Sequence, residues 1–394
     1  MSDTPTPSAP NRPRRLLLLG LGSVVLLAAV VSSAYYLVHG RWYESTEDAY
    51  ANGNIVMVTP QVPGTVVEIA AEDNAGVQTG QVLLRLDDSD TRVALEQADA
   101  TLARTVRQVR GLYANLDGQT ADLSVKRAAL ERARDDVARR KGLDSTGAVS
   151  KEEVAHAQTA FEQAERSFNA TRGQLVATEA LVDNTTVATH PEVKAAAANV
   201  RRAYLDHARS ALQASVNGYV TQRNVQLGQH VAPGKPLLAL VPLDQIWVDA
   251  NFKETQLEHM RIGQPVELHA DLYGKDVTYH GHVASFGVGT GSALSLLPAQ
   301  NATGNWIKIV QRVPVRVALD PKELAEHPLR IGLSMHVEVD MHDRSGAVLR
   351  QTPPDQPVYA TDIYQQQLQQ ADRHVQDVIR ASLGATTGQP KKHS

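Results

Sequence analysis

The feature that most constrains the fold is an internal repeat whose two copies lie far apart in the chain. Eight identical residues recur at a constant separation of 154 positions, first over residues 62–86 and again over residues 216–240. Each copy is predicted to contain a turn glycine, a short alternating strand, a second turn glycine and another short apolar strand. Units of 25 residues are too small to fold alone, so we expect the two copies to pack face to face as one small β-sandwich. The chain must therefore leave this sandwich and come back to it.

Apolar residues at a strict spacing of seven fill the segment between the two copies. They run outward over 95–137 and return over 154–182, the pattern of a coiled-coil seam. Ser150 is followed three residues later by Glu153, which is the signature of a capping box at the start of a helix. We therefore expect an antiparallel coiled-coil hairpin with its tip near 142–150.

A second interruption divides the returning arm. Residues 184–191 lack the heptad pattern, and Pro191 suits the first turn of a further helix. The returning arm is therefore expected to consist of two helices placed end to end.

An uncharged segment near the N-terminus predicts a membrane anchor. Residues 16–38 carry no charge and are long enough to cross a hydrocarbon core of ~30 Å once. Arginines precede the segment and aromatic residues follow it, which predicts a cytoplasmic N-terminus. A cleaved signal peptide is the alternative, because Ser32, Ser33 and Ala34 are small enough for cleavage, although its apolar region normally has only ~7 to 15 residues. The chain contains no cysteine, which excludes lipidated-cysteine anchoring, disulfides and thiolate chemistry.

Alternating apolar residues after the second repeat copy predict an antiparallel β-barrel. The strand patterns extend over 243–342, with a long Gly-, Ser- and Asn-rich loop over 287–305 and a short helix expected over 253–260. Beyond residue 343 the chain becomes polar, with a proline-rich stretch that leads to a weak Gln-rich helix and a basic end. We expect this C-terminal tail to be mobile.

The sequence offers little support for an enzyme. His280 and His282 are two apart on an expected strand and could bind a metal, but alternating surface histidines are the more common arrangement. No Walker A sequence is present, and the basic run over 132–141 lacks the aromatic residues that a nucleic-acid site needs. The two-copy sandwich resembles a biotinyl or lipoyl carrier domain, but no lysine occurs over 46–115 to carry the prosthetic group. We therefore expect no catalytic residue, no cofactor, no metal and no nucleic-acid partner.

Four local sequences, together with this domain order, resemble the periplasmic adaptor or membrane fusion proteins of the HlyD family. Within that family the likeness is to multidrug-efflux adaptors of the EmrA type. The sequences are EDAY at 47–50, WVDANFKETQ at 247–256, MRIGQPV at 260–266 and LLPAQNATGNWIKIVQR at 296–312.

The expected fold is multidomain α+β: an N-terminal transmembrane helix, a split lipoyl-like β-sandwich interrupted by a long antiparallel coiled-coil hairpin, and then a small antiparallel β-barrel. The expected boundaries are a cytoplasmic tail at 1–15, the anchor at 16–38, a membrane-proximal strand and linker at 45–61, the first half of the lipoyl-like domain at 62–88, the hairpin at 89–212, the second half of the lipoyl-like domain at 216–242, the barrel at 243–342 and the polar tail at 343–394.

The resemblance implies a function and a set of partners. It implies an adaptor in the inner membrane of a Gram-negative bacterium, with its body in the periplasm. The adaptor would form a homo-oligomer and link an inner-membrane major-facilitator drug transporter to a TolC-type outer-membrane channel, for export of hydrophobic toxic compounds. An adaptor for an ABC-type polypeptide exporter and a coiled-coil tether without a transport role remain alternatives.

The resemblance also implies two sets of contact residues. Many adaptors of the family dock on the outer-membrane channel through an Arg, a Leu four residues later and a Ser seven residues after that, a spacing matched by Arg139, Leu143 and Ser150. The alternative is that none of them docks: Arg139 is then a solvated cation, Leu143 closes the coiled-coil seam and Ser150 only caps a helix. The barrel loop carries the other set, predicted to contact a second protomer or the pump unless it only closes the barrel: Asn301, Gly304, Asn305 and Trp306.

Overall fold

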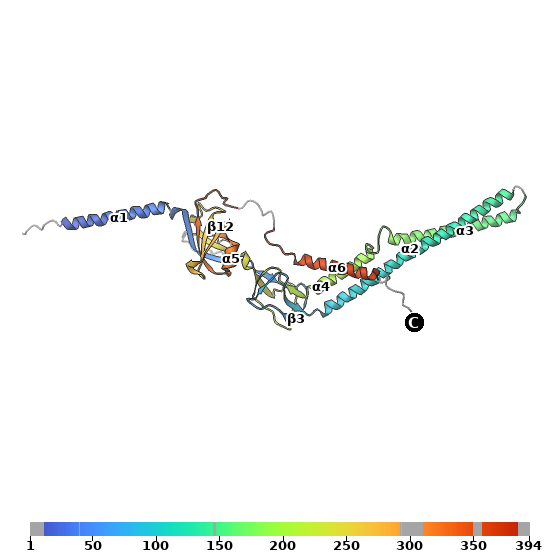
Figure 1. Ribbon diagram of the computed structural model, residues 1–394, viewed down its shortest axis with the longest axis horizontal. Helices are drawn as coiled ribbons and strands as arrows, with labels where there is room; N and C mark the ends of the chain where they lie inside the picture. Colours follow the sequence, from blue (N-terminus) through green and yellow to red (C-terminus); the bar gives the residue numbers. More distant parts are fainter. Residues whose placement is uncertain are drawn as a thin grey trace, which may run out of the picture.

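The computed structural model shows an elongated molecule (Figure 1). A barrel, a two-sheet domain and a helical rod follow one another along the long axis, and α1 (Arg12–Val38) projects from the barrel end. The structure describes residues 12–38, 40–144, 147–291, 293, 310–349 and 357–384.

Helix α1 coincides with the segment expected to anchor the chain in a membrane. Side chains at several of its positions, among them residues 12–17 and 34–38, lie outside the described set. Among the helices that the structure describes, none combines the length and the apolar character needed to cross a bilayer.

The barrel is a closed sheet of six antiparallel strands in the order β1-β10-β13-β12-β11-β14. Alternate residues point inward and form a core around Phe252, Tyr279 and Leu268, all fully buried. The strands are β1 (Tyr43–Asn52), β10 (Trp247–Lys253), β11 (Pro265–Ala270), β12 (Thr278–Phe286), β13 (Arg312–Leu319) and β14 (Ser334–Asp340). Short helices connect them or adjoin the barrel: η1 (Gly40–Trp42), η2 (Leu243–Gln245), η3 (Glu254–Gln256), η4 (Gly274–Asp276) and α5 (Pro321–Glu326).

The first barrel strand precedes the hairpin in the chain, which corrects the sequence-based expectation. The sequence predicted a membrane-proximal strand and linker over 45–61, separate from a barrel that begins after the second repeat copy. Instead, β1 pairs with both β10 and β14, so that Ala49 lies opposite Ala250 on one side and Met335 on the other. Ala49 and Ala51 are buried in the barrel core. The expected helix over 253–260 is likewise shorter and consists only of η3.

Two four-stranded sheets lie next to the barrel and contain both repeat copies. Strands of the two copies pair directly, since β3 pairs with β8 and β4 with β7, and one apolar core joins residues of both copies. The sheet orders are β2-β9-β7-β4 and β6-β5-β3-β8. The strands are β2 (Val56–Val58), β3 (Gly64–Ile69), β4 (Gly76–Val77), β5 (Val82–Leu86), β6 (Ala211–Gln213), β7 (Gly218–Thr221), β8 (His230–Val231) and β9 (Leu238–Val241).

The helical hairpin rises from these sheets as α2 (Ser89–Asp144), α3 (Lys151–Val182) and α4 (Pro191–Ala208). With 56 residues, α2 is one continuous helix of about 84 Å. The returning arm is divided between α3 and α4. Burial is deepest near the sheets, where Leu102, Val106 and Val109 are fully buried against α4.

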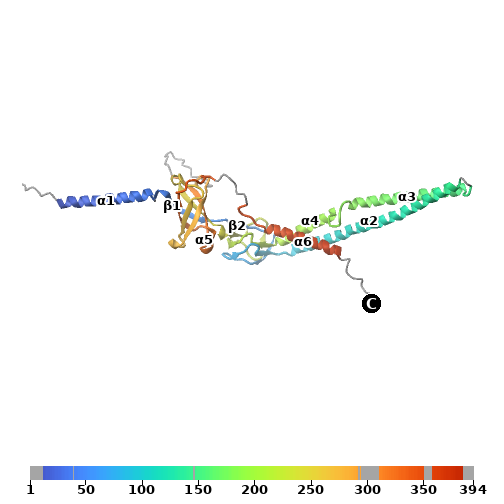
Figure 2. The same cartoon turned by 45° about the horizontal axis from the view of Figure 1, so that its top comes forward.

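The C-terminal segment contradicts the expectation of a mobile tail. Residues 363–384 form helix α6 (Ile363–Gly384), which lies along α2 and α4 in both views (Figures 1 and 2). Ile363, Ala371 and Val375 are buried. The sequence alone shows glutamines here, but their positions leave one apolar face that this packing covers.

Candidate docking and assembly sites

The tip of the hairpin holds the three residues predicted to dock on a channel. Arg139 and Leu143 lie in the last turns of α2, and Ser150 immediately precedes α3. Residues 145 and 146 between the arms lie outside the described residues. The tip is the end of the rod farthest from the barrel (Figure 1), so all three residues occupy the extremity of the molecule.

Arg139 and Leu143 are both accessible. The Arg139 guanidinium lies 3.3 Å from Asp136, with 68% of its side chain exposed. Asp136 is shared, because Arg140 approaches its other oxygen at 2.9 Å. Because exposed ion pairs of this kind contribute little to stability, Arg139 can leave Asp136 for another partner at a small cost in free energy. Leu143 is 47% exposed, which is a large accessible fraction for an apolar residue at a helix end.

Ser150 forms the expected capping box with Glu153. Its hydroxyl accepts from the Glu153 backbone N–H at 3.3 Å, and the Glu153 carboxylate accepts from the Ser150 backbone N–H at 2.9 Å. These bonds, first the one from the Ser150 backbone and then the one from its hydroxyl, lower the pKa of Glu153. Ser150 therefore has a structural role at the tip besides any contact with a partner.

The second predicted contact set cannot be placed. Asn301, Gly304, Asn305 and Trp306 lie outside the described residues. The strands that precede and follow this segment in the chain, β12 and β13, are paired in the barrel wall.

His280, one of the two histidines considered as metal ligands, is hydrogen-bonded to Glu323. His280 Nδ1 lies 2.7 Å from a Glu323 carboxylate oxygen, and the other oxygen accepts from the His280 backbone N–H at 2.6 Å. The bond to Glu323 raises the pKa of His280. Within the described parts of the chain, no group of three or more potential metal ligands comes together.

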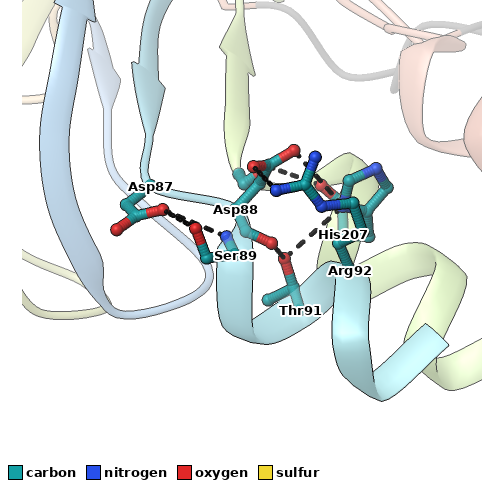
Figure 3. A network of polar contacts seen from close by, with 7 residues as sticks. Asp87, Asp88, Ser89, Thr91, Arg92 and His207 are labelled. Atoms are coloured by element: carbon teal, nitrogen blue, oxygen red, sulfur yellow. Dashed lines mark hydrogen bonds and ion pairs between the residues drawn. The ribbon is translucent and has the colours of Figure 1, made fainter. Parts of the chain in front are cut away.

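A polar network surrounds the point where the chain leaves the sheets for the hairpin (Figure 3). The Asp87 carboxylate accepts from both the hydroxyl and the backbone N–H of Ser89, at 2.6 and 3.1 Å, and these bonds lower its pKa. The Thr91 hydroxyl donates to the Asp88 carbonyl at 2.9 Å and lies 3.5 Å from His207 of the returning arm. Both arms are therefore joined at the base of the hairpin, in the turn where a carrier domain would display its lysine. No sequence pattern pointed to His207, which lies 116 positions from Thr91.

Comparison with known proteins assigns the two main domains. Residues 89–210 match the family model of the EmrA alpha-helical hairpin domain, and residues 245–340 match that of the AAEA-like beta-barrel domain.

Two curated relatives extend over nearly the whole chain. The Multidrug export protein EmrA of Haemophilus influenzae is 41% identical over 364 residues, covering 92% of this chain and 93% of that protein. The Fatty acid resistance protein FarA of Neisseria gonorrhoeae is 47% identical over 344 residues, covering 87% of this chain and 86% of that protein. A solved structure of the periplasmic adaptor protein EmrA is a more distant match, 18% identical with a TM-score of 0.37, covering 76% of this chain and 99% of that one.

A barrel and a long helical hairpin matched in this way define a membrane fusion adaptor. The chain belongs to the EmrA branch of the HlyD-family periplasmic adaptor proteins.

Proposed function

We propose that this protein is the adaptor of a tripartite efflux pump, linking an inner-membrane major-facilitator transporter to a TolC-type outer-membrane channel. The observation that carries the proposal is the separation of its two ends. Helix α2 alone spans about 84 Å, with the barrel beyond one end and an exposed docking tip at the other. A molecule of this shape can reach from one membrane protein toward another, and several protomers side by side could enclose a conduit.

The proposed substrates are hydrophobic toxic compounds. The names of the relatives support this class, because one is called a multidrug export protein and another a fatty acid resistance protein. Pump and channel are proposed from family membership and from the geometry of the tip. If the partner were an ABC polypeptide exporter, deleting the gene would abolish secretion of a protein. If the chain were only a tether, no transporter would copurify with it in mild detergent.

We further propose that residues 16–38 anchor the chain, with the N-terminus cytoplasmic and the body in the periplasm of a Gram-negative cell. The uncharged segment after Arg14 and Arg15 supports this orientation. Replacing residues 1–40 by a cleavable signal should give a body that no longer sediments with inner membranes. Undiminished efflux from that form would show that anchoring is dispensable.

The docking proposal is tested at Leu143. In a strain lacking the chromosomal gene, Leu143→Asp should abolish resistance to hydrophobic drugs and site-specific crosslinking to the channel, because a charge replaces the exposed apolar contact. Val125→Asp is the matched control, since Val125 is also an exposed apolar residue of α2, 64% accessible, but lies away from the tip. Wild-type resistance with Leu143→Asp, or equal loss with both variants, would refute docking through this residue.

The barrel loop is proposed to contact a neighbouring protomer or the pump. Replacing Asn305 by a bulky residue should impair efflux and oligomer crosslinking while the melting temperature stays nearly unchanged. A large fall in melting temperature would instead identify the loop as an element that closes the barrel.

A further inference from the structure

Helix α6 packs into the groove between the two arms at the base of the hairpin. Val375 joins an apolar cluster that contains Leu102 of α2 and Val200 of α4, and Ala371, one turn earlier, is also buried. Val378 and Ile379 extend the same face one turn further. The base is therefore a three-helix unit, whereas the hairpin beyond it consists of α2 and α3 alone.

An ion pair and a hydrogen bond hold α6, one to each arm. Asp372 accepts from Arg201 of α4 at 2.6 Å, and His374 lies 2.9 Å from Asp99 of α2. The His374 ring also packs against Tyr204 of α4, with ring centroids 5.2 Å apart. Neighbouring residues of one helix thus hold both arms at the same level of the hairpin.

The N-terminal end of α6 reaches the two-sheet domain. Ile363 is buried and, with Tyr364 and Gln367, lines a cavity of about 70 Å³. Strand residues including Val58 and Leu212 form the opposite wall. Helix α6 therefore contacts the sheets at one end and the hairpin along the rest of its length.

The interruption of the returning arm lies next to the part of the hairpin that α6 covers, since Val187 packs against the same apolar cluster as Val375. Helix α3 ends at Val182 and α4 starts at Pro191, with Asn184 in a left-handed conformation at φ 54°. Arg107 of α2 lies beside the C-terminal end of α6, where both line a shallow surface pocket. Tyr113, further along α2, bonds to Thr185 in the interruption. The interruption therefore adjoins the part of the hairpin that α6 covers.

We propose that α6 is a brace that fixes the base of the hairpin to the two-sheet domain, so that the rod does not bend at its root. In this view the C-terminal segment sets the direction in which the tip points. The inference stands on the packing of this chain and is independent of which pump or channel it serves.

Hydrogen exchange on the full-length protein in detergent tests the brace. Val375→Asp should raise amide exchange at least tenfold in α4 and over 95–107 of α2, because it places a charge in the groove. Gln376→Asp, one residue along on the exposed face, should leave exchange there unchanged. Equal exchange in both variants would overturn the proposal.

Reversing the charges of the pair formed by Arg201 and Asp372 controls for variants that simply misfold. Arg201→Asp should raise exchange in α4 because Asp372 then faces a like charge, and adding Asp372→Arg should restore the wild-type rate. Failure of the second change to restore protection would count against the brace.

Spin labels measure the bending itself. The chain has no native cysteine, so Glu72→Cys in the two-sheet domain and Arg202→Cys in α4 can be labelled selectively. Their distance distribution should be narrow in the full chain and should broaden when the chain ends after Thr361. An equally narrow distribution without α6 would show that the root is rigid by itself and would refute the proposal.

Discussion

His190 connects the two helices of the returning arm through both nitrogens of its ring. Its Nε2 donates to the carbonyl oxygen of Leu181, in the last turn of α3, at 3.0 Å. Its Nδ1 accepts from the Glu192 backbone N–H at 3.3 Å, which caps α4. Because a carbonyl only accepts and an N–H only donates, these bonds require the neutral ring with its proton on Nε2. The side chain is buried, so this histidine holds the interruption in shape.

Two substitutions of His190 distinguish the contributions of these two hydrogen bonds. His190→Leu removes both, whereas His190→Asn keeps an oxygen that can cap α4 but is too short to reach Leu181. We expect faster amide exchange at the start of α4 only in the Leu variant, and faster exchange near 181–187 in both. Loss of an N-cap corresponds to about 1 kcal/mol of local stability. Identical exchange profiles for the two variants would show that the cap contributes nothing.

The capping box at the tip predicts a local effect of Ser150. Ser150→Ala removes the acceptor for the Glu153 backbone N–H and should fray the first turn of α3, with a local cost of about 1 kcal/mol. Amide exchange at 151–154 measures this cost. Ser150→Asp retains a capping oxygen and should keep the turn protected; if efflux falls equally with Asp and Ala, the hydroxyl itself is needed at the docking surface. Normal efflux with a frayed Ala variant would assign Ser150 a purely structural role.

The pair formed by His280 and Glu323 predicts a pH dependence. Its hydrogen bond raises the folded-state pKa of His280 above the unfolded value. The resulting stabilisation is therefore complete below the unfolded pKa and is lost as the pH rises through the folded pKa. In an NMR titration the His280 midpoint should fall in Glu323→Gln. Glu326→Gln on the same short helix is the control and should leave it in place. An unchanged midpoint in Glu323→Gln would contradict the assignment.

The sequence predicted the elements whose signal is local or strictly periodic. The heptads located the hairpin, and Ser150 with Glu153 located the start of α3, because both patterns act within a few turns of helix. The barrel was predicted as a fold but without its first strand. Tyr43–Asn52 contains polar residues and two small alanines, and only its pairing with β10 and β14, some 200 and 290 positions away, shows that it belongs to the barrel.

The sequence predicted a weak Gln-rich helix in the C-terminal tail but not its packing against the hairpin, for a related reason. Its apolar residues are few and are separated by glutamines, so the composition resembles that of a solvated tail. It is held by burial of Val375 against α2 and α4, and by polar contacts to Arg201 and Asp99, none of which a single sequence places together. The tip residues were found from their spacing, but their accessibility required the structure.

The repeat supplies a matched pair of glycines for a last prediction. Gly64 and Gly218 are the first glycines of the two repeat copies, and the sequence pattern predicted a turn at each. The structure instead makes each the first residue of a strand, and their need for glycine is steric. A Cβ on Gly218 would lie 2.6 Å from the Val241 backbone oxygen, whereas a Cβ on Gly64 would meet only the Leu86 side chain, at 3.1 Å.

These contacts predict unequal effects of the same substitution. Gly218→Ala forces the backbone of β9 to move, and overpacking of this kind costs about 1 to 3 kcal/mol. Gly64→Ala requires only a small adjustment of Leu86 and should cost clearly less. Thermal unfolding of the two variants side by side measures the difference, with Gly234→Ala as a reference for glycines needed for their positive φ, here 83°. If Gly64→Ala destabilised the protein as much as Gly218→Ala, the two copies would be equally tight and the backbone contact at Val241 would not explain the requirement for glycine.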